Sequence, residues 1–362
     1  MRITSVSHIR ETITFQENSM AKVKRNWMGL ITIGVTIGII TYFAISDPNV
    51  KNLGSLLGRL NPLGLLGAVC CSLIYIYSES QILYQACKLV PGKMNFIQSV
   101  KSSIIGNYYS ALTPFSTGGQ PFQVAYMKKW DVPTGSSSSV LALCFFMWHI
   151  CVTSISIIAY ILYRSFIATQ RGLSAACILG IFLSFIGVVA GGLLLSGLSL
   201  EKPLNFIKRI LIKIKVIKNV EKVDKSLSNW INDFNGAIVL FKKYPQKAFG
   251  MLLLTLVKLV SHCSVVYCIY RGFGLSMLSF WNVIFFQVLL TAAVAFVPLP
   301  GASGASEGVF YIIFGKIFIN GTTFPAMLIW RGFTYYIYLL LGALLSIYDG
   351  VKNVGVNKEG AS

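Results

Sequence analysis

The chain has 362 residues, of which 55% are hydrophobic and only 12% are charged, and its 31 Lys and Arg against 12 Asp and Glu give a net charge of +19. An average soluble domain carries about 25% charged residues, so this composition excludes an ordinary soluble globular protein, and its hydrophobicity excludes a disordered chain. A mean hydropathy of +0.68 places most of the chain in a membrane. The basic excess must therefore be compared with the cytoplasmic bias of Lys and Arg in membrane proteins before it is taken to indicate nucleic acid.

Stretches of about 20 apolar residues are long enough to cross the hydrocarbon core of a bilayer. Seven such stretches occur, in chain order Trp27–Ser46, Leu63–Leu83, Val140–Tyr163, Leu173–Leu198, Ala248–Tyr270, Leu278–Val297 and Pro325–Tyr348. Two further stretches, Phe96–Tyr126 and Pro298–Phe318, are too polar for lipid-facing helices and too apolar for loops. Irregular backbone at membrane depth survives only where it is buried in protein or lines a cavity, so we expect both to be re-entrant or broken helices. The predicted fold is an all-α polytopic membrane protein with about seven transmembrane helices and these two motifs.

The basic residues predict the orientation of this layout. With both termini in the cytoplasm, 23 of the 31 Lys and Arg lie in cytoplasmic segments and six lie outside, which accounts for the net charge without nucleic acid. The predicted organisation is a basic cytoplasmic N-terminus at 1–26, an integral membrane domain at 27–348 and a cytoplasmic tail at 349–362. The membrane domain contains a basic amphipathic cytoplasmic segment at 201–247. Met20 offers an alternative start. The amphipathic segment either lies on the anionic inner leaflet or serves as a linker helix.

The two predicted broken-helix stretches, Phe96–Tyr126 and Pro298–Phe318, share a short sequence pattern. Thr113–Gln120, the first motif, reads TPFSTGGQ, and Leu299–Glu307, the second motif, reads LPGASGASE. In each, a proline precedes a glycine by four positions, and Ser or Thr precedes that glycine. In the predicted topology the first motif enters from the cytoplasm and the second from outside, an inverted repeat of the kind that marks transporter sites. A helix restarting after such a break directs its amide groups into the membrane, which favours an anion such as a phosphate. Two purely structural kinks are the alternative.

Four charged residues fall within or beside the spans, namely Glu79, Lys258, Glu307 and Arg331. A charge at mid-membrane costs about 2.5–3.5 kcal/mol on insertion scales, so each needs a partner or a watery cavity. Either the two cations and two carboxylates neutralise one another, or Arg331 or Lys258 binds a lipid phosphate while a carboxylate meets a cationic headgroup. The predicted substrate-binding residues are Glu79, Thr113, Pro114, Ser116, Gly118, Gly119, Gln120, Lys258, Pro300, Gly301, Gly304, Ser306, Glu307 and Arg331. No catalytic residue, metal site or cofactor is predicted.

Three segments, Gly106–Gln123, Pro298–Gly308 and Trp330–Tyr336, resemble signatures of the lysylphosphatidylglycerol synthase transmembrane-region family. The resemblance extends over most of the chain and implies a multi-pass protein of the bacterial cell membrane that handles lipids. In bifunctional relatives this region is coupled to moving aminoacylated phosphatidylglycerol to the outer leaflet, which confers resistance to cationic antimicrobial peptides. Two departures are evident. Gln120 stands at the glutamate position of the first motif, and no soluble segment is large enough for the family's lysyltransferase domain.

The predicted function is therefore a lipid translocator of flippase type for an anionic or aminoacylated phospholipid. Phosphatidylglycerol, lysyl-phosphatidylglycerol and polyprenyl-phosphate lipids are the candidate substrates. The alternatives are a phosphatidylglycerol lysyltransferase, another lipid-linked transferase, or a membrane partner of one. A transferase would need a positioned acid or base, for which Glu79, Glu307 and Asp131 are the candidate carboxylates. Nucleic acid is expected as a partner only through a separate tRNA-dependent synthase, and assembly into a homo-oligomer is left open.

Overall fold

The computed structural model describes residues 53–58, 60–170, 172–196, 220–319 and 321–359, together with positions 34, 38 and 41. The predicted N-terminus 1–26, nearly all of the predicted first span 27–46 and the basic segment 201–219 lie outside these residues. Where it is described, the chain is helical and contains no strand.

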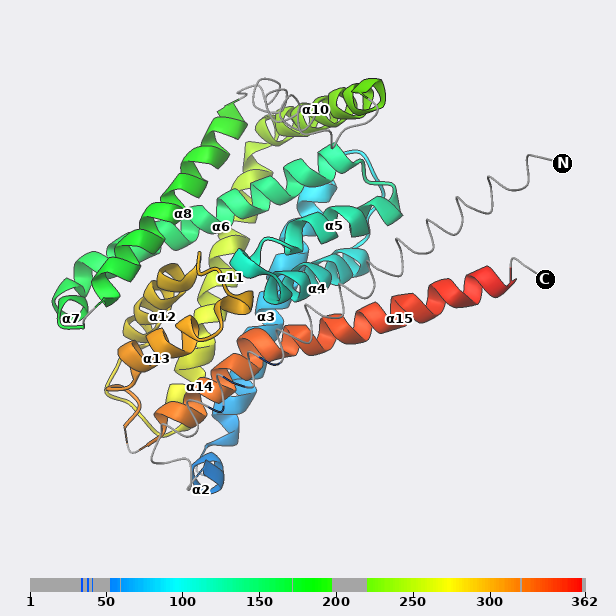
Figure 1. The fold of residues 1–362 in the computed structure, drawn as a ribbon. Coiled ribbons are helices and arrows are strands. Elements are labelled where there is room, and N and C mark those ends of the chain that lie inside the picture. The colour runs from blue at the N-terminus through cyan, green and yellow to red at the C-terminus, as the bar shows by residue number, and fades with distance from the viewer. Residues whose placement is uncertain are drawn as a thin grey trace.

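The described elements follow one another as shown in Figure 1. They are α2 (Leu53–Gly58), α3 (Pro62–Cys87), α4 (Phe96–Leu112), η2 (Pro114–Ser116), α5 (Gly119–Met127), η3 (Lys128–Trp130), α6 (Thr134–Leu162), α7 (Arg164–Ala168), α8 (Leu173–Ser196), α10 (Val220–Lys243), α11 (Pro245–Gly272), α12 (Phe280–Val294), η4 (Pro300–Ala302), α13 (Ala305–Phe314), α14 (Thr323–Arg331), the π-helical turn η5 (Gly332–Tyr336) and α15 (Ile337–Glu359).

Five of the described helical segments are long and apolar enough to cross a membrane: Pro62–Cys87, Thr134–Leu162, Leu173–Leu193, Pro245–Gly272 and Thr323–Asp349. Each corresponds to one of the predicted spans. The predicted span at 278–297 is different, because its helix α12 has only 15 residues. At about 1.5 Å per residue it is roughly 22 Å long, short of a hydrocarbon core of about 30 Å. In place of the expected full span, the structure has a helix of about three quarters of that length.

The central contact of the fold is an antiparallel pair formed by α3 and α11. The amide of Asn61, which caps the start of α3, donates to the carbonyl of Gly272 at the end of α11 (2.8 Å). Gly64 packs so closely on Gly272 that a Cβ at position 64 would lie 2.5 Å from the Gly272 Cα atom. Small residues at helix interfaces allow this approach in membranes. The start of α3 therefore lies beside the end of α11.

Two helical hairpins extend from this pair. Helices α4 and α5 pack together and are joined by η2 (the first hairpin), and α12 and α13 pack together and are joined by η4 (the second hairpin). The first hairpin follows the C-terminal end of α3 and the second follows the C-terminal end of α11. Because α3 and α11 are antiparallel, the hairpins start from opposite ends of the pair, and their tips η2 and η4 are in contact. The stretches Phe96–Tyr126 and Pro298–Phe318 are therefore broken helices, as predicted.

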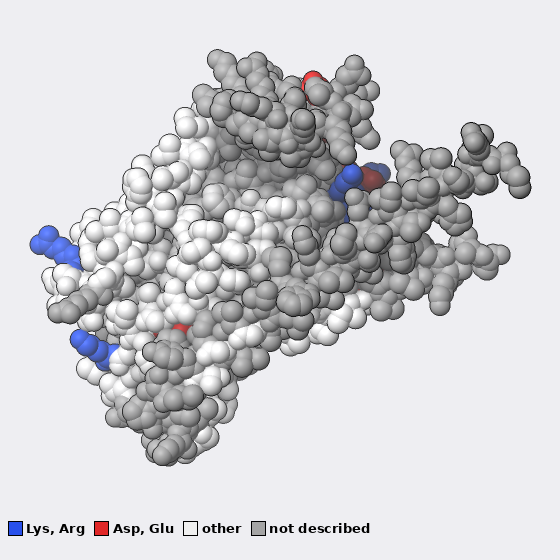
Figure 2. Space-filling view, viewed as in Figure 1, with Lys and Arg blue, Asp and Glu red and all other residues white. Residues whose placement is uncertain are grey.

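The surface is that of a membrane protein. The outward face of α8 exposes large apolar side chains, among them Ile178, Leu179, Phe182, Phe185, Ile186 and Val189. In Figure 2 the charged side chains of the described part of this face gather toward its two ends, and the surface between them is almost uncharged. An apolar band of this extent is unsuited to water and suited to lipid.

Helix α10 makes up most of the described part of the predicted amphipathic segment 201–247. Its apolar side chains Ile231, Phe234, Ile238 and Phe241 are buried, and α10 packs on α6. This half of the segment therefore uses its apolar face for packing against protein rather than lipid.

Candidate functional site

The two motifs adopt the same backbone conformation over four residues. Each begins with an extended residue, followed by proline and then by two residues with positive φ. The φ values are −113° at Thr113, 56° at Phe115 and 54° at Ser116 in the first motif, and −119° at Leu299, 57° at Gly301 and 50° at Ala302 in the second. They diverge from the following residue onward, because ψ is −19° at Thr117 but 140° at Ser303, and φ is −73° at Gly118 but 87° at Gly304. The resemblance read from the sequence thus extends to the shape of the turn.

In both motifs a side-chain oxygen accepts the N–H of the glycine that precedes the restarting helix. Thr113 Oγ1 accepts from Gly118 (2.8 Å), and Glu307 Oε2 accepts from Gly304 (2.6 Å). These contacts satisfy one of the donor groups that a helix start leaves unpaired. Part of the anion-binding capacity expected of the two helix starts is therefore already used by the chain itself.

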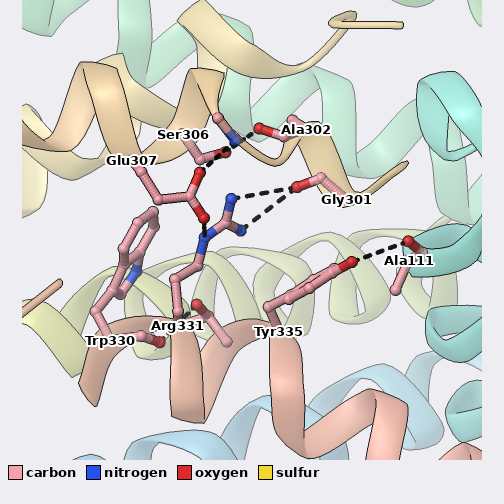
Figure 3. A network of polar contacts seen from close by, with 10 residues as sticks. Ala111, Gly301, Ala302, Ser306, Glu307, Trp330, Arg331 and Tyr335 are labelled. Carbon is pink, nitrogen blue, oxygen red and sulfur yellow. Dashed lines mark hydrogen bonds and ion pairs between the residues drawn. The ribbon is translucent and has the colours of Figure 1, made fainter. Parts of the chain in front are cut away.

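Glu307 and Arg331 form a buried ion pair. Arg331 Nε lies 2.7 Å from Glu307 Oε1, and both guanidinium NH2 groups approach the carbonyl of Gly301 at 3.4 Å (Figure 3). The two side chains are only 6% and 3% exposed. The Arg331 guanidinium also lies 5.1 Å from the rings of Trp330 and Tyr335, whose hydroxyl donates to the carbonyl of Ala111 on α4. This network ties α14 to the tip of the second hairpin and, through Tyr335, to the first hairpin.

A second ion pair joins α3 to α11. Lys258 Nζ lies 3.1 Å from Glu79 Oε1, and the amide of Asn107 on α4 donates to Glu79 Oε2 at 2.6 Å. The Lys258 ammonium also lies 4.7 Å from the ring of Trp148 and 5.1 Å from that of Tyr75. With exposed fractions of 13% and 19%, this pair is more open than the first. The four intramembrane charges therefore meet as two pairs, which is the neutralising arrangement that the sequence left as one alternative.

A cavity of about 450 Å³ opens between the motifs and is walled by α3, α4, α6, α11, α12 and α14. Half of the predicted site residues line it: Glu79, Ser116, Gln120, Lys258, Gly301, Ser306 and Arg331. The other predicted residues do not: Thr113, Pro114, Gly118, Gly119, Pro300, Gly304 and Glu307. The latter build the turns or hold Arg331, so their part in the cavity is indirect. Both members of the Glu79–Lys258 pair face the cavity.

The comparison with known families now decides the membership of the chain. A model described as the lysylphosphatidylglycerol synthase TM region matches residues 28–342. The chain belongs to the lysylphosphatidylglycerol synthase transmembrane-region family. It is accordingly a multi-pass membrane protein of a lipid-related family. No curated protein matches it.

This family member also lines its cavity with residues that the sequence did not single out. They include Tyr75, Asn107, Trp148, His262, Gln287 and Tyr338. Asn107 lies in the segment that carries the resemblance, where its position after a glycine and before two tyrosines was visible but not interpreted. The others sit within apolar spans and give no local signal. Among the described residues, no group of three or more His, Cys, Asp or Glu could hold a metal ion.

Proposed function

We propose that the chain is a membrane lipid translocator for an anionic or aminoacylated phospholipid. The observation that carries this proposal is the charged cavity at the point where the tips of two opposed hairpins meet. A headgroup crossing a bilayer needs polar partners at mid-depth, because an unpaired charge there is costly. A cavity that is lined by two cations, one carboxylate and several neutral polar groups supplies such partners without a channel of water.

The opposed hairpins further support an inverted-topology repeat. One half consists of α3 and the first hairpin, and the other of α11 and the second hairpin. Broken helices at corresponding places of two inverted halves surround the substrate in many transporters, which alternate access by moving one half against the other. In this arrangement the η2–η4 contact is the place where the cavity would open to one leaflet or to the other.

The Glu79–Lys258 pair is the group we assign to headgroup binding. Its ammonium faces the cavity and is partly exposed, so a lipid phosphate can compete with Glu79 for Lys258. Glu79 is then free to meet an ammonium on an aminoacylated headgroup. Arg331 is held by Glu307 and by Gly301, so we assign it to shaping the site. Ser116, Gln120 and Ser306 are proposed as neutral contacts.

The location of the protein follows from the same proposal. We place it in a bacterial plasma membrane with both termini in the cytoplasm, in keeping with the distribution of Lys and Arg. There it would act in the lysyl-phosphatidylglycerol pathway and support resistance to cationic antimicrobial peptides. Single cysteines introduced at Lys129 and Lys316 in a cysteine-free chain test the orientation. An impermeant thiol reagent applied to whole cells should label the second and spare the first; the opposite labelling would overturn the placement.

The function is tested with purified protein in vesicles. Each candidate lipid, namely phosphatidylglycerol, its lysyl ester or a polyprenyl phosphate, carries a fluorophore that an impermeant reductant bleaches only in the outer leaflet. We expect wild type to expose the inner-leaflet pool of one of them, and Lys258→Met to slow that exposure at least tenfold. Lys247→Met is the matched control, since Lys247 lies exposed on the same helix, outside the cavity. A wild-type protein that moves none of the three lipids would overturn the proposal.

A further inference from the structure

The cavity wall carries several buried polar atoms without a partner in the described chain, among them Ser103 Oγ and His149 Nδ1, and Gln287 has the largest unpaired group. Gln287, on α12, is fully buried, and within the described chain neither its amide nitrogen nor its amide oxygen makes a hydrogen bond. A buried polar group without a partner costs about 1–3 kcal/mol, so such groups are rare in folded proteins and call for an explanation. Gln287 lines the cavity described above, which suggests that its partner is a ligand.

The local structure does not offer Gln287 an internal solution. Several serine and threonine side chains on the spans are satisfied by donating to a carbonyl one turn earlier, as Thr255 and Ser261 do. Thr291 donates in the same way to the backbone carbonyl of Gln287, at 2.9 Å. The side-chain amide, in contrast, has two donors and an acceptor to place, and none of them is paired within the described chain.

The neighbouring charges limit what the missing partner can be. The two cations that line the cavity, Lys258 and Arg331, each have a carboxylate partner, so this wall has no uncompensated charge. A further unpaired donor, Trp330 Nε1, also belongs to a residue that lines the cavity. The unmet demand is therefore for neutral groups. A carbonyl would satisfy only the donors of Gln287, whereas a hydroxyl both donates and accepts and so can answer both ends of the amide.

We propose that Gln287 is a specificity-determining residue that hydrogen-bonds a hydroxyl group of the lipid headgroup, such as a glycerol or sugar hydroxyl. The inference rests on the proposed function, since it names the chemistry that the same cavity selects. The phosphate is bound at Lys258, and the hydroxyl-bearing end of the headgroup lies against α12. A site built to bond a hydroxyl discriminates against an analogue that lacks it, because the amide is then left unpaired.

The experiment compares two lipids of equal charge. Short-chain phosphatidylglycerol has two headgroup hydroxyls, and short-chain phosphatidylpropanol has the same phosphate diester and three-carbon chain without them. Affinities are measured for the detergent-purified full chain by native mass spectrometry and by the shift in thermal unfolding temperature. We expect wild type to prefer phosphatidylglycerol roughly tenfold, which corresponds to one net hydrogen bond or two, and Gln287→Met to bind both lipids within twofold of each other.

Three controls make the result decisive. Gln246→Met makes the same change at an exposed position at the start of α11 and should keep the wild-type preference. Gln287→Asn retains an amide group and should lose only part of the preference for phosphatidylglycerol. Since methionine removes an unsatisfied polar group, Gln287→Met should be as thermally stable as wild type without lipid. If Gln287→Met fails to fold, the role of Gln287 is still tested by the wild-type preference between the two lipids and by its reduction in Gln287→Asn.

The outcomes separate the two proposals. Equal wild-type binding of both lipids, or an undiminished preference in Gln287→Met, would overturn the role of Gln287 and leave the proposed function standing. A wild-type chain that binds neither of these lipids nor a lipid of the vesicle assay would overturn both.

Discussion

The ammonium of Lys258 on α11 lies 3.1 Å from the carboxylate of Glu79 on α3, and this contact joins the two antiparallel helices at the centre of the fold. Bulk water cannot replace either partner in solvating the other charge, because the side chains of Lys258 and Glu79 are only 13% and 19% exposed. The pair has two consequences. It makes the charges tolerable at membrane depth, and it leaves each of them dependent on the other.

This dependence predicts how substitutions at the pair combine. Lys258→Met leaves the half-buried Glu79 with only Asn107 as a partner, and Glu79→Gln leaves the ammonium without a countercharge. Each should lower the free energy of unfolding by about 1–3 kcal/mol. The double variant has no unpaired charge and should cost less than the sum of the two, by about 1 kcal/mol or more. Thermal unfolding in detergent measures all four proteins, and simple additivity would show that the two side chains do not interact.

The second pair predicts a ranking of substitutions at Glu307. This carboxylate accepts from Arg331 with one oxygen and from the Gly304 amide with the other. Glu307→Ala loses both contacts and leaves the Arg331 charge buried, which should cost about 3–5 kcal/mol. Glu307→Gln keeps an oxygen that can accept from Gly304, so it should be milder, although lipid transport should fall in both. Unfolding temperatures measured at matched detergent concentration give the ranking, which equal or reversed values would contradict.

Hydropathy and turn residues predict much of this architecture. Where the structure differs from the prediction, the difference has a physical reason. The long spans and the breaks at Pro114 and Pro300 are local signals, so the sequence contained them. Hydropathy predicts a full span at Leu278–Val297 because it continues past Val294, where helix α12 ends. Which carboxylate meets which cation depends on the register between α3 and α11, which no local pattern specifies. The sequence also gives no signal for Gln287. A single amide in an apolar helix indicates no function until the cavity beside it is known.

The register of α3 against α11 can be tested by chemical crosslinking. Cys71 Sγ and Cys268 Sγ lie 3.8 Å apart across this contact. An added two-electron oxidant such as iodine should convert the two thiols to a disulfide with release of two protons, since a shift of about 2 Å brings the sulfurs to bonding distance. Peptide mapping under non-reducing conditions should find the 71–268 crosslink in wild type and in Cys70→Ser, but not in Cys71→Ser. A crosslink from Cys70 to Cys268 instead would mean that α3 is rotated from its position here.

The matching turns of the two motifs predict opposite tolerance at equivalent positions. Phe115 and Gly301 have nearly equal φ values of 56° and 57°, but their surroundings differ. Phe115 is 50% exposed, so Phe115→Gly removes left-handed strain at little loss of packing and should leave the free energy of unfolding within about 1 kcal/mol of wild type. A Cβ at position 301 would lie 2.0 Å from Cε2 of Tyr335, so Gly301→Ala should cost about 1–3 kcal/mol.

The cause of that loss can be isolated with Tyr335, whose ring occupies the space that the new methyl group needs and whose hydroxyl bonds Ala111 on the first hairpin. If the clash is the main cause, Gly301→Ala should cost clearly less in a Tyr335→Ala background, where only the left-handed strain of an alanine at φ 57° remains. Unfolding temperatures of the four proteins in this cycle provide the test. An undiminished loss in that background would place the cost in the backbone of the turn, whereas a clearly smaller loss would show that the close approach of η4 to Tyr335 is the main reason for glycine at position 301 and not at position 115.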